Sequence, residues 1–371
     1  MNYPEIPLFK VFMAETAINE VSRVLYSGYI GEGDDVVLFE KELCATLGVK
    51  NLLTTNSGTS ALHLAYHMAT EQRDDAEIIT SPITCTATNT PIIHNNAKIV
   101  WADVDPVTGN IDLEDVRTLI GPRTRAVVMV HWGGNPGDIG AINEIGRQRG
   151  VKVIEDAAHS LGATYRGVPV GAHSDFVAFS FQAIKHVTSV DGGGLVCKDD
   201  ADHARGKLLR WYGIDRTIRE GIDLRCEVDV AEAGYKFHMN NVTAAIGREN
   251  LKHLSWILER HGRNAEFYNL AFRDHGKIRT VPVNSDAGSA YWLYTIHVEN
   301  RDELMKRLLE NGIGASKVHS RNDSHSMFGR FKRPLPNADA FERTHICIPV
   351  GWWLSESDRE RVADAVIRFA R

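Results

Sequence analysis

Between about residues 50 and 200, short apolar runs alternate with amphipathic segments, and this alternation limits the fold more than any other feature of the chain. The runs are rich in Val and Ile and of strand length; they occupy 52–55, 77–80, 98–104, 125–132, 151–157, 175–181 and 193–199. Such strands, separated by helices, predict an α/β fold with a mostly parallel sheet covered by helices on both faces. The last two runs, joined through 182–192, are compatible with one antiparallel strand.

After about residue 250 the pattern changes. A long helical pattern at 243–270 is followed by a strand-like run at 291–298 and by helical patterns at 301–311 and 355–370. This order predicts a smaller α+β domain packed on the first. We therefore expect a large domain with an N-terminal segment over 1–245 and a small C-terminal domain over 246–371.

The charge and cysteine content exclude several classes of protein. The net charge of -6 comes from 42 basic and 48 acidic residues without a basic block, which argues against nucleic acid or an anionic membrane as partner. The five cysteines are scattered and form no CxxC pair, so we expect neither a disulfide framework nor a metal site. No signal peptide or apolar run of membrane-spanning length is present, and we expect a cytoplasmic protein.

Polar residues follow the predicted strands, at the edge where an open parallel sheet binds its ligands. The first group, residues 56–60, leads into a helix. Its small residues Gly58 and Thr59 would let an anion such as phosphate approach the free N–H groups of the helix start. A helix cap without a ligand explains the same residues equally well.

The second group contains Asp156 and His159, directly after the apolar stretch VKVI. A carboxylate among apolar neighbours stays ionised only beside a cation, and a protonated pyridine nitrogen is such a cation. His159, three residues further on, is placed to contact a ring hydroxyl. A cap for the following turn is the alternative explanation.

The third group contains Lys185, in a short loop beyond the strand at 175–181, with Ser180 placed to reach a phosphate. Partial burial lowers the pKa of a lysine and makes its amine nucleophilic, as Schiff-base chemistry requires. The fourth group, glycines 192–194, implies a tight turn or the close approach of another group. No GxGxxG or GxxxxGK[ST] motif is present, and the order of the four groups predicts pyridoxal 5'-phosphate (PLP) as cofactor.

Four stretches resemble the DegT/DnrJ/EryC1/StrS family of PLP-dependent nucleotide-sugar aminotransferases. They are FEKELCATLGVKNLLTTNSGTSALHLA (39–65), VKVIEDAAHSLGATYRG (151–167), DFVAFSFQAIKHVTSVDGGGLV (175–196) and GYKFHMNNVTAAIG (234–247). The resemblance covers nearly the whole chain and is weakest beyond residue 315. It implies the fold type I of PLP-dependent aminotransferases and a homodimer whose subunits share their active sites.

The resemblance also implies a role for each matching residue. Lys185 would form the Schiff base and shuttle the proton, Asp156 would keep the pyridine nitrogen protonated, and His159 would contact the ring hydroxyl. The phosphate would be held by small residues at two loops, namely Gly58, Thr59 and Ser180.

Residues 235–241 match the family segment that reaches the partner subunit's site, so the candidates for a contact with the partner's phosphate are Lys236, His238 and Asn240.

The sequence also departs from the family pattern. Cys85 stands where an aromatic residue usually stacks on the cofactor ring. The ring contact would then be looser, come from Cys85 itself, or come from elsewhere, with Trp132 as one candidate. Val190 replaces a usual glycine, and Asp191 stands where glutamate is commoner.

The segment 316–328 also differs from the family version, and it would face the substrate. Its His319, Arg321 and His325 suit an anion, either a nucleotide diphosphate or an acidic amino-acid donor. A solvated loop is an equal alternative. The sugar, its nucleotide and the carbon that is aminated are not determined by these residues.

The implied activity is transfer of an amino group from an amino acid, with L-glutamate favoured, to a nucleotide-linked keto-deoxy sugar by ping-pong transamination. The product would serve surface polysaccharide (lipopolysaccharide O-antigen) or glycoside biosynthesis. Relatives with histidine in place of the lysine are dehydratases, and here Lys185 is present with His186 only as its neighbour. The alternatives are a dehydratase or non-catalytic regulatory relative, and a nucleotide-binding protein without PLP; Cys85 is the feature that favours them.

Overall fold

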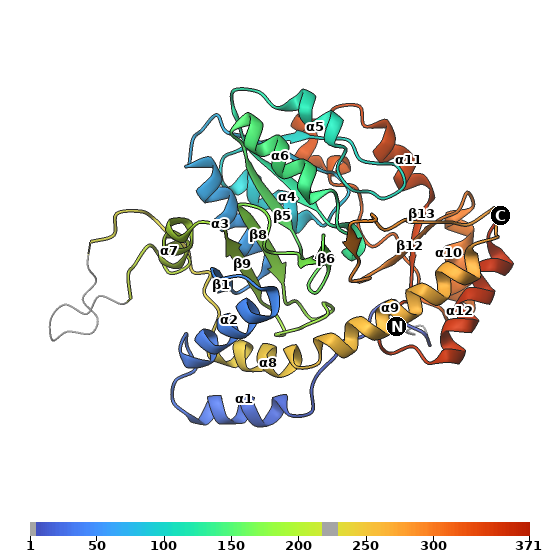
Figure 1. Ribbon diagram of the computed structural model, residues 1–371, viewed down its shortest axis with the longest axis horizontal. Coiled ribbons are helices and arrows are strands. Elements are labelled where there is room, and N and C mark those ends of the chain that lie inside the picture. Colours follow the sequence, from blue (N-terminus) through green and yellow to red (C-terminus); the bar gives the residue numbers. More distant parts are fainter. Residues whose placement is uncertain (1–4, 217–228) are drawn as a thin grey trace.

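The structure is a computed structural model that describes residues 5–216 and 229–371. A large twisted sheet lies between layers of helices, and a smaller sheet with its own helices is attached at the C-terminal side (Figure 1). Cys226 lies outside the described residues. Within the described ranges, no helix has the length and apolar character needed to cross a bilayer.

The large sheet has seven strands in the order β1-β9-β8-β5-β4-β2-β3. Strands β2, β3, β4, β5 and β8 are parallel to their neighbours among these five, whereas β9 is antiparallel to both β1 and β8. The predicted mostly parallel sheet, with its one antiparallel strand, is confirmed. The strands are β1 (Leu52–Thr55), β2 (Glu77–Thr80), β3 (Lys98–Trp101), β4 (Thr124–Val130), β5 (Lys152–Asp156), β8 (Phe176–Ser180) and β9 (Gly193–Cys197).

Helices cover both faces of this sheet because successive strand residues point to opposite sides. On β4, Val128 belongs to the apolar cluster that contains Leu64 of α3, whereas Val127 belongs to the cluster that contains Ile142 of α6. All four side chains are buried. The helices of this part are α3 (Gly58–Thr70), α4 (Thr86–His94), α5 (Leu113–Leu119), α6 (Ile139–Arg149) and α7 (Asp200–Leu209), with the 3-10 turn η1 (Trp132–Gly134).

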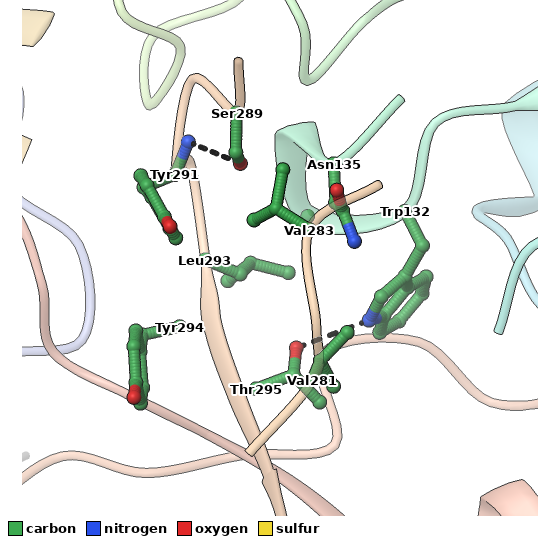
Figure 2. Close-up of a pocket in the computed structure, with 10 residues that line it drawn as sticks. Trp132, Asn135, Val281, Val283, Ser289, Tyr291, Leu293, Tyr294 and Thr295 are labelled. Carbon is green, nitrogen blue, oxygen red and sulfur yellow. Dashed lines mark hydrogen bonds between the residues drawn. The ribbon is translucent and has the colours of Figure 1, made fainter. Parts of the chain in front are cut away.

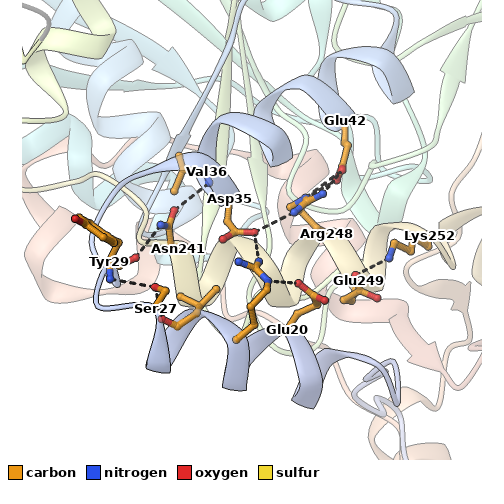
Figure 3. A network of polar contacts seen from close by, with 12 residues as sticks. Glu20, Ser27, Tyr29, Asp35, Val36, Glu42, Asn241, Arg248, Glu249 and Lys252 are labelled. Carbon is orange, nitrogen blue, oxygen red and sulfur yellow. Dashed lines mark hydrogen bonds and ion pairs between the residues drawn. The ribbon is translucent and has the colours of Figure 1, made fainter.

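The N-terminal helices α1 (Ala17–Tyr26) and α2 (Asp34–Leu47) pack beside α8 (Asn241–Leu251) (Figure 1). The buried carboxylate of Asp35 joins the three helices, because it accepts hydrogen bonds from Arg23 (2.7 Å) and Arg248 (2.9 Å). Arg248 also binds Glu42 on α2 at 2.8 Å (Figure 3). This ion network fixes the N-terminal segment on the large domain.

The C-terminal part contains the antiparallel sheet β10-β12-β13 and the apolar cluster beneath it. The helical pattern at 243–270 is divided between α8 and α9, and the expected domain boundary at 245/246, which falls within α8, stays a prediction. The elements are α9 (Leu254–Phe272), β10 (Arg279–Thr280), β12 (Tyr294–His297), α10 (Arg301–Glu310), α11 (Pro336–Thr344), β13 (His345–Ile348) and α12 (Glu356–Phe369).

Shorter elements connect the two parts. In a third sheet, the central strand β6 (Thr164–Tyr165) pairs with β7 (Val168–Pro169) on one side and with β11 (Ala287–Gly288) on the other, so the chain before β12 is attached to the large domain. The segment 316–328 contains the 3-10 turn η2 (Asn322–Ser324) and the start of η3 (Ser326–Phe331). Asn322 donates to the backbone of Thr84 at 2.7 Å, which holds this segment against the start of α4.

Candidate active site

A cavity of about 440 Å³ opens at the carboxyl ends of β5 and β8 and beside the first turn of α3. This is the edge of an open parallel sheet at which ligands bind. The structure brings most of the predicted site residues together here. Those that line the cavity are Gly58, Thr59, Cys85, Asp156, His159, Ser180, Lys185 and His319.

The first turn of α3 provides the anion-binding end of the cavity. Ser57 caps the helix by accepting from the backbone N–H of Ser60 at 3.1 Å, while the N–H groups of Gly58 and Thr59 have no intrahelical acceptor by helix geometry. A side chain on Gly193 would place its Cβ 2.4 Å from the Ser57 carbonyl, so glycine is needed there. The close approach expected for the glycine group is therefore between β9 and this loop.

Asp156 is the last residue of β5 and is held by hydrogen bonds on both carboxylate oxygens. Oδ2 accepts from the Thr88 hydroxyl at 2.6 Å, and Oδ1 accepts from the backbone N–H of Ala158 at 3.1 Å. The Thr88 hydroxyl is itself 2.6 Å from that of Thr84. Asp156 is buried yet lines the cavity, so its charge is directed at whatever cation the cavity holds.

Thr88→Val should therefore destabilise the protein. The substitution removes the only side-chain donor to Asp156 among the described residues, and we expect a loss of about 1.5–3 kcal/mol of unfolding free energy, the range for a hydrogen bond to a charged group. Thr88→Ser, which keeps the hydroxyl, is the matched control. Urea unfolding measures both variants; equal stability of the Val and Ser variants would show that the hydroxyl does not hold the carboxylate.

Lys185 lies in the loop after β8, with its backbone N–H bonded to the Gln182 carbonyl at 2.9 Å. Burial lowers the pKa of its amine to about 7, and the nearby Asp156 and Cys85 act in the opposite direction. A substantial fraction of the amine is therefore neutral near pH 7, which is the form that attacks an aldehyde.

His159 presents an imidazole that is neutral at physiological pH. Burial, followed by the neighbouring charge of Lys185, lowers its pKa well below the ordinary value. The ring stacks on Trp292 with 3.8 Å between centroids, and its buried Nδ1 has no hydrogen-bond partner among the described residues. A buried nitrogen of this kind is available to a ligand.

The two tryptophans near this site have different positions. Trp132 does not line the cavity; it borders a separate pocket of about 20 Å³, where its indole N–H donates to the Thr295 hydroxyl at 3.1 Å (Figure 2). Trp292 and Phe9 line the cavity instead, beside Cys85. Sequence reasoning did not find these two residues, because nothing in their neighbourhoods distinguishes them from core aromatics.

The comparisons with known proteins identify the family. The profile of the DegT/DnrJ/EryC1/StrS aminotransferase family matches residues 12–367. The chain belongs to this family.

Three relatives of this DegT-family chain illustrate the match. The spore coat polysaccharide biosynthesis protein SpsC of Bacillus subtilis is 33% identical, over 97% of this chain and 96% of its own. The sugar aminotransferase CalS13 from Micromonospora echinospora superposes with a TM-score of 0.94 at 38% identity, covering 98% of this chain and 99% of its own. AtS13 from Actinomadura melliaura gives 0.92 at 40% identity, covering 99% of each chain. The predicted family, fold class and enzyme class, a PLP-dependent sugar aminotransferase, are confirmed.

The cavity of this DegT-family enzyme fits PLP, the cofactor of the family. The first turn of α3 suits the phosphate, the buried carboxylate of Asp156 suits the protonated ring nitrogen, and the amine of Lys185 suits the aldehyde. The unpartnered Nδ1 of buried His159 suits the ring hydroxyl. Cys85 lies in the cavity, where it can meet the ring as a small apolar contact.

The remaining candidate residues do not line this cavity. Arg321 is bound in ion pairs with Asp323 (2.6 Å) and Asp339, and His325 lies at the start of η3. Lys236 places its Nζ 3.7 Å from the centre of the Trp211 ring, and His238 contacts the same ring.

Asn240 lies at the beginning of α8, where its side chain caps the helix by accepting from Thr243 at 3.0 Å. Within one subunit, none of the three residues from 236–240 reaches the cavity. A contact of these residues with the cofactor would have to be with that of another subunit.

Two further positions explain family features of the loop that contains Lys185. Val190, which replaces the usual glycine, has a φ of 73°, a left-handed conformation that costs a β-branched residue about 1–3 kcal/mol and explains why glycine is common there. His186 is buried outside the cavity, with its Nε2 3.0 Å from the Ala290 carbonyl oxygen. His186 is therefore a structural residue of the loop.

Proposed function

We propose that the enzyme transfers an amino group from L-glutamate to a nucleotide-linked keto-deoxy sugar by a ping-pong reaction. The observation that supports this most directly is that Lys185, Asp156 and the first turn of α3 line one cavity. A further wall of the cavity comes from the C-terminal segment, with Ser316, Val318 and His319. A substrate larger than the cofactor thus has a surface of its own to bind.

In the proposed reaction, bound PLP supplies an electron sink that makes the C–H bond beside the transferred nitrogen acidic. The amine of Lys185, whose pKa burial lowers to about 7, can take a proton from that carbon and return it. Asp156 holds the positive charge at the ring nitrogen, because its carboxylate is kept in place by Thr88 and Ala158. Trp292 and Phe9 help to exclude water.

The position of the lysine favours transamination over dehydration. Lys185 lines the cavity, whereas His186 is outside it and bound to the Ala290 carbonyl. A change of side-chain rotamer alone would not bring His186 into the cavity in place of Lys185, since the His186 side chain is buried elsewhere. A dehydratase of this family would need a histidine where Lys185 lies.

His319 is proposed to contact the sugar rather than the diphosphate. Burial, followed by the charge of Lys185, lowers its pKa to about 4, so the imidazole is neutral near pH 7. A neutral imidazole can bind a hydroxyl or keto oxygen, but it attracts an anion weakly. Arg321 is already neutralised by Asp323 and Asp339, so the cations for a diphosphate or donor carboxylate must come from elsewhere.

A second subunit is the proposed source of these cations. Lys236 is exposed outside the cavity of its own subunit, and it can serve the partner's site in a homodimer. The residues 18–38 also expose a large apolar surface, of the kind that marks protein interfaces. Its members, by exposed fraction, are Ile18 (69%), Leu25 (53%), Tyr26 (89%), Tyr29 (79%), Ile30 (53%), Val37 (47%) and Leu38 (40%).

Mixing inactive chains tests the shared site. Each proposed site combines Lys185 of one subunit with Lys236 of the other. A Lys185→Ala chain refolded with a Lys236→Ala chain should therefore recover about a quarter of wild-type activity. Half of the dimers are mixed, and each mixed dimer has one intact site out of two. Native mass spectrometry confirms that mixed dimers form. Mixed dimers without activity would show that each subunit builds its site alone.

The donor and acceptor are tested in two separate half-reactions. L-glutamate alone should yield one equivalent of 2-oxoglutarate per bound cofactor, and a panel of nucleotide-linked keto sugars should then be aminated by the enzyme freed of glutamate. L-aspartate and L-glutamine are the comparison donors. Amination of free keto sugars as fast as the nucleotide-linked ones would contradict the proposed acceptor.

The proposed product is an amino sugar for surface polysaccharide or glycoside assembly. Support comes from SpsC, named for spore coat polysaccharide biosynthesis, and from the sugar aminotransferase CalS13. A role in lipopolysaccharide O-antigen and a cytoplasmic location remain predictions from the sequence.

A further inference from the structure

Trp292 is a buried residue in the wall of the cavity. It lies between β11 and β12 in the chain, is 4% exposed, and lines the cavity together with Lys185 and His159. The backbone here approaches η1 so closely that a Cβ on Gly134 would lie 3.0 Å from the Trp292 nitrogen and 2.7 Å from the His159 carbonyl oxygen. Glycine at 134 thus lets the backbones at 159 and 292 both approach η1 closely.

The indole of Trp292 makes directed contacts with the loop that contains Lys185 and with His159. The indole N–H donates to the carbonyl of Ile184, the residue before Lys185, at 2.9 Å. The Lys185 Nζ lies 3.7 Å from the centre of the Trp292 ring. The His159 ring stacks on the same indole, with 3.8 Å between the ring centres and 18° between the ring planes. Phe9 stacks at 4.9 Å and supports the indole from the N-terminal segment. A tryptophan that only filled space would not need these directed contacts.

The position of the amine on the ring has an energetic consequence. A cation over an aromatic face is attracted by the ring quadrupole, most strongly by that of tryptophan and more so when water is excluded. The ammonium form of Lys185 is therefore stabilised on Trp292 relative to the neutral amine. Other titratable groups around the amine also interact electrostatically with its charge. They are Asp156, Cys85, His159, His319 and the adjacent His186.

We propose that Trp292 is a positioning residue that receives the free amine of Lys185 on its ring face and fixes the preceding carbonyl with its indole N–H. A lysine that releases the cofactor during a reaction needs a defined place to hold its proton close to the reacting carbon. Trp292 supplies that place at the wall of the same cavity. The proposal rests on the proposed role of Lys185, and its test is independent of turnover.

The test is a titration of Lys185 in the chain without cofactor. Reductive methylation with formaldehyde and a borane reagent modifies the neutral amine, and peptide mass spectrometry gives the rate at Lys185 as a function of pH. We expect a midpoint near pH 7 in the wild type. In Trp292→Leu the midpoint should fall by about one pH unit, because the ammonium loses its aromatic partner. Trp292→Phe should give a smaller fall, since phenylalanine attracts a cation less strongly.

Trp101→Phe and Trp101→Leu are the matched controls, because Trp101 is fully buried in the same apolar cluster and does not line the cavity. Both should lower the melting temperature without moving the Lys185 midpoint. If Trp292→Leu fails to fold, the fall in Trp292→Phe alone supports the proposal. A midpoint in the Trp292 variants that is unchanged or higher would overturn it and leave Trp292 as a core residue, whatever the activity of Lys185.

Discussion

Lys185→Ala is expected to reduce turnover by at least about 10⁴-fold, because it removes both the nucleophile for the cofactor and the base that moves the proton. PLP should still bind through the first turn of α3 and Asp156, which the substitution leaves unchanged. Dialysis followed by absorption spectroscopy measures the retained cofactor, and steady-state kinetics measures the turnover.

Lys185→Arg is the control for charge. Arginine keeps the positive charge but is not deprotonated in proteins, so this variant should be as inactive as the alanine variant. A small primary amine added to Lys185→Ala should restore part of the activity, and it should restore none to Lys185→Arg. Activity of the alanine variant within tenfold of wild type would show that the cavity does not use Lys185 as proposed.

Asp156→Asn is expected to slow the glutamate half-reaction by about 10²–10⁴-fold. This is the typical contribution to the rate of a group that controls a proton in the reaction. The amide is nearly isosteric but neutral, so the ring nitrogen is no longer kept protonated and withdraws electrons less strongly. The loss arises in the chemical step, so the limiting rate constant of this half-reaction should fall more than its apparent Kd for glutamate changes. Stopped-flow absorption of the half-reaction gives both constants.

Asp156→Glu separates charge from position. The longer carboxylate keeps the charge but cannot keep the bonds to Thr88 and Ala158 in the same geometry. We expect activity between those of the Asn variant and the wild type. An Asn variant as fast as the wild type would exclude a role for the Asp156 charge in the half-reaction.

Most of the large domain could be predicted from the sequence, because the signals are local. The apolar runs that became β4, β5 and β8 have strand length and composition, and the residues that end them are polar. The division between α8 and α9 could not be seen in this way. Lys252 and His253 have φ values of -57° and -100°, both in the right-handed helical region, so the helical spacing continues through the break.

The same distinction holds for the candidate site. Asp156 and Ser180 end their strands and Lys185 lies in the loop after β8, so topology alone brings these side chains to one edge of the sheet. Thr88 and Trp292 reach the cavity only because elements distant in the chain pack together, and no short sequence motif predicts such packing. The sequence also could not show that Arg321 is neutralised, because Asp339 comes from a separate helix.

Residues 236–240 differ from the cavity residues, since their proposed role depends on a second subunit. Lys236 lies exposed on the surface of its own subunit, with its Nζ over the Trp211 ring. The exposed apolar surface of 18–38 gives a physical reason for the proposed association with a second copy.

Whether Lys185 holds a working cofactor is best decided by the visible absorption spectrum of the purified protein. The spectrum is recorded before and after addition of L-glutamate, for the wild type and for Lys185→Ala. We expect a yellow wild-type protein whose band bleaches with glutamate and returns with an acceptor sugar. We expect the Lys185→Ala protein to have an altered band that glutamate does not bleach. A protein that stays colourless when PLP is added would contradict the assignment of this cavity as a working cofactor site. A yellow protein that ignores glutamate would contradict the proposed donor.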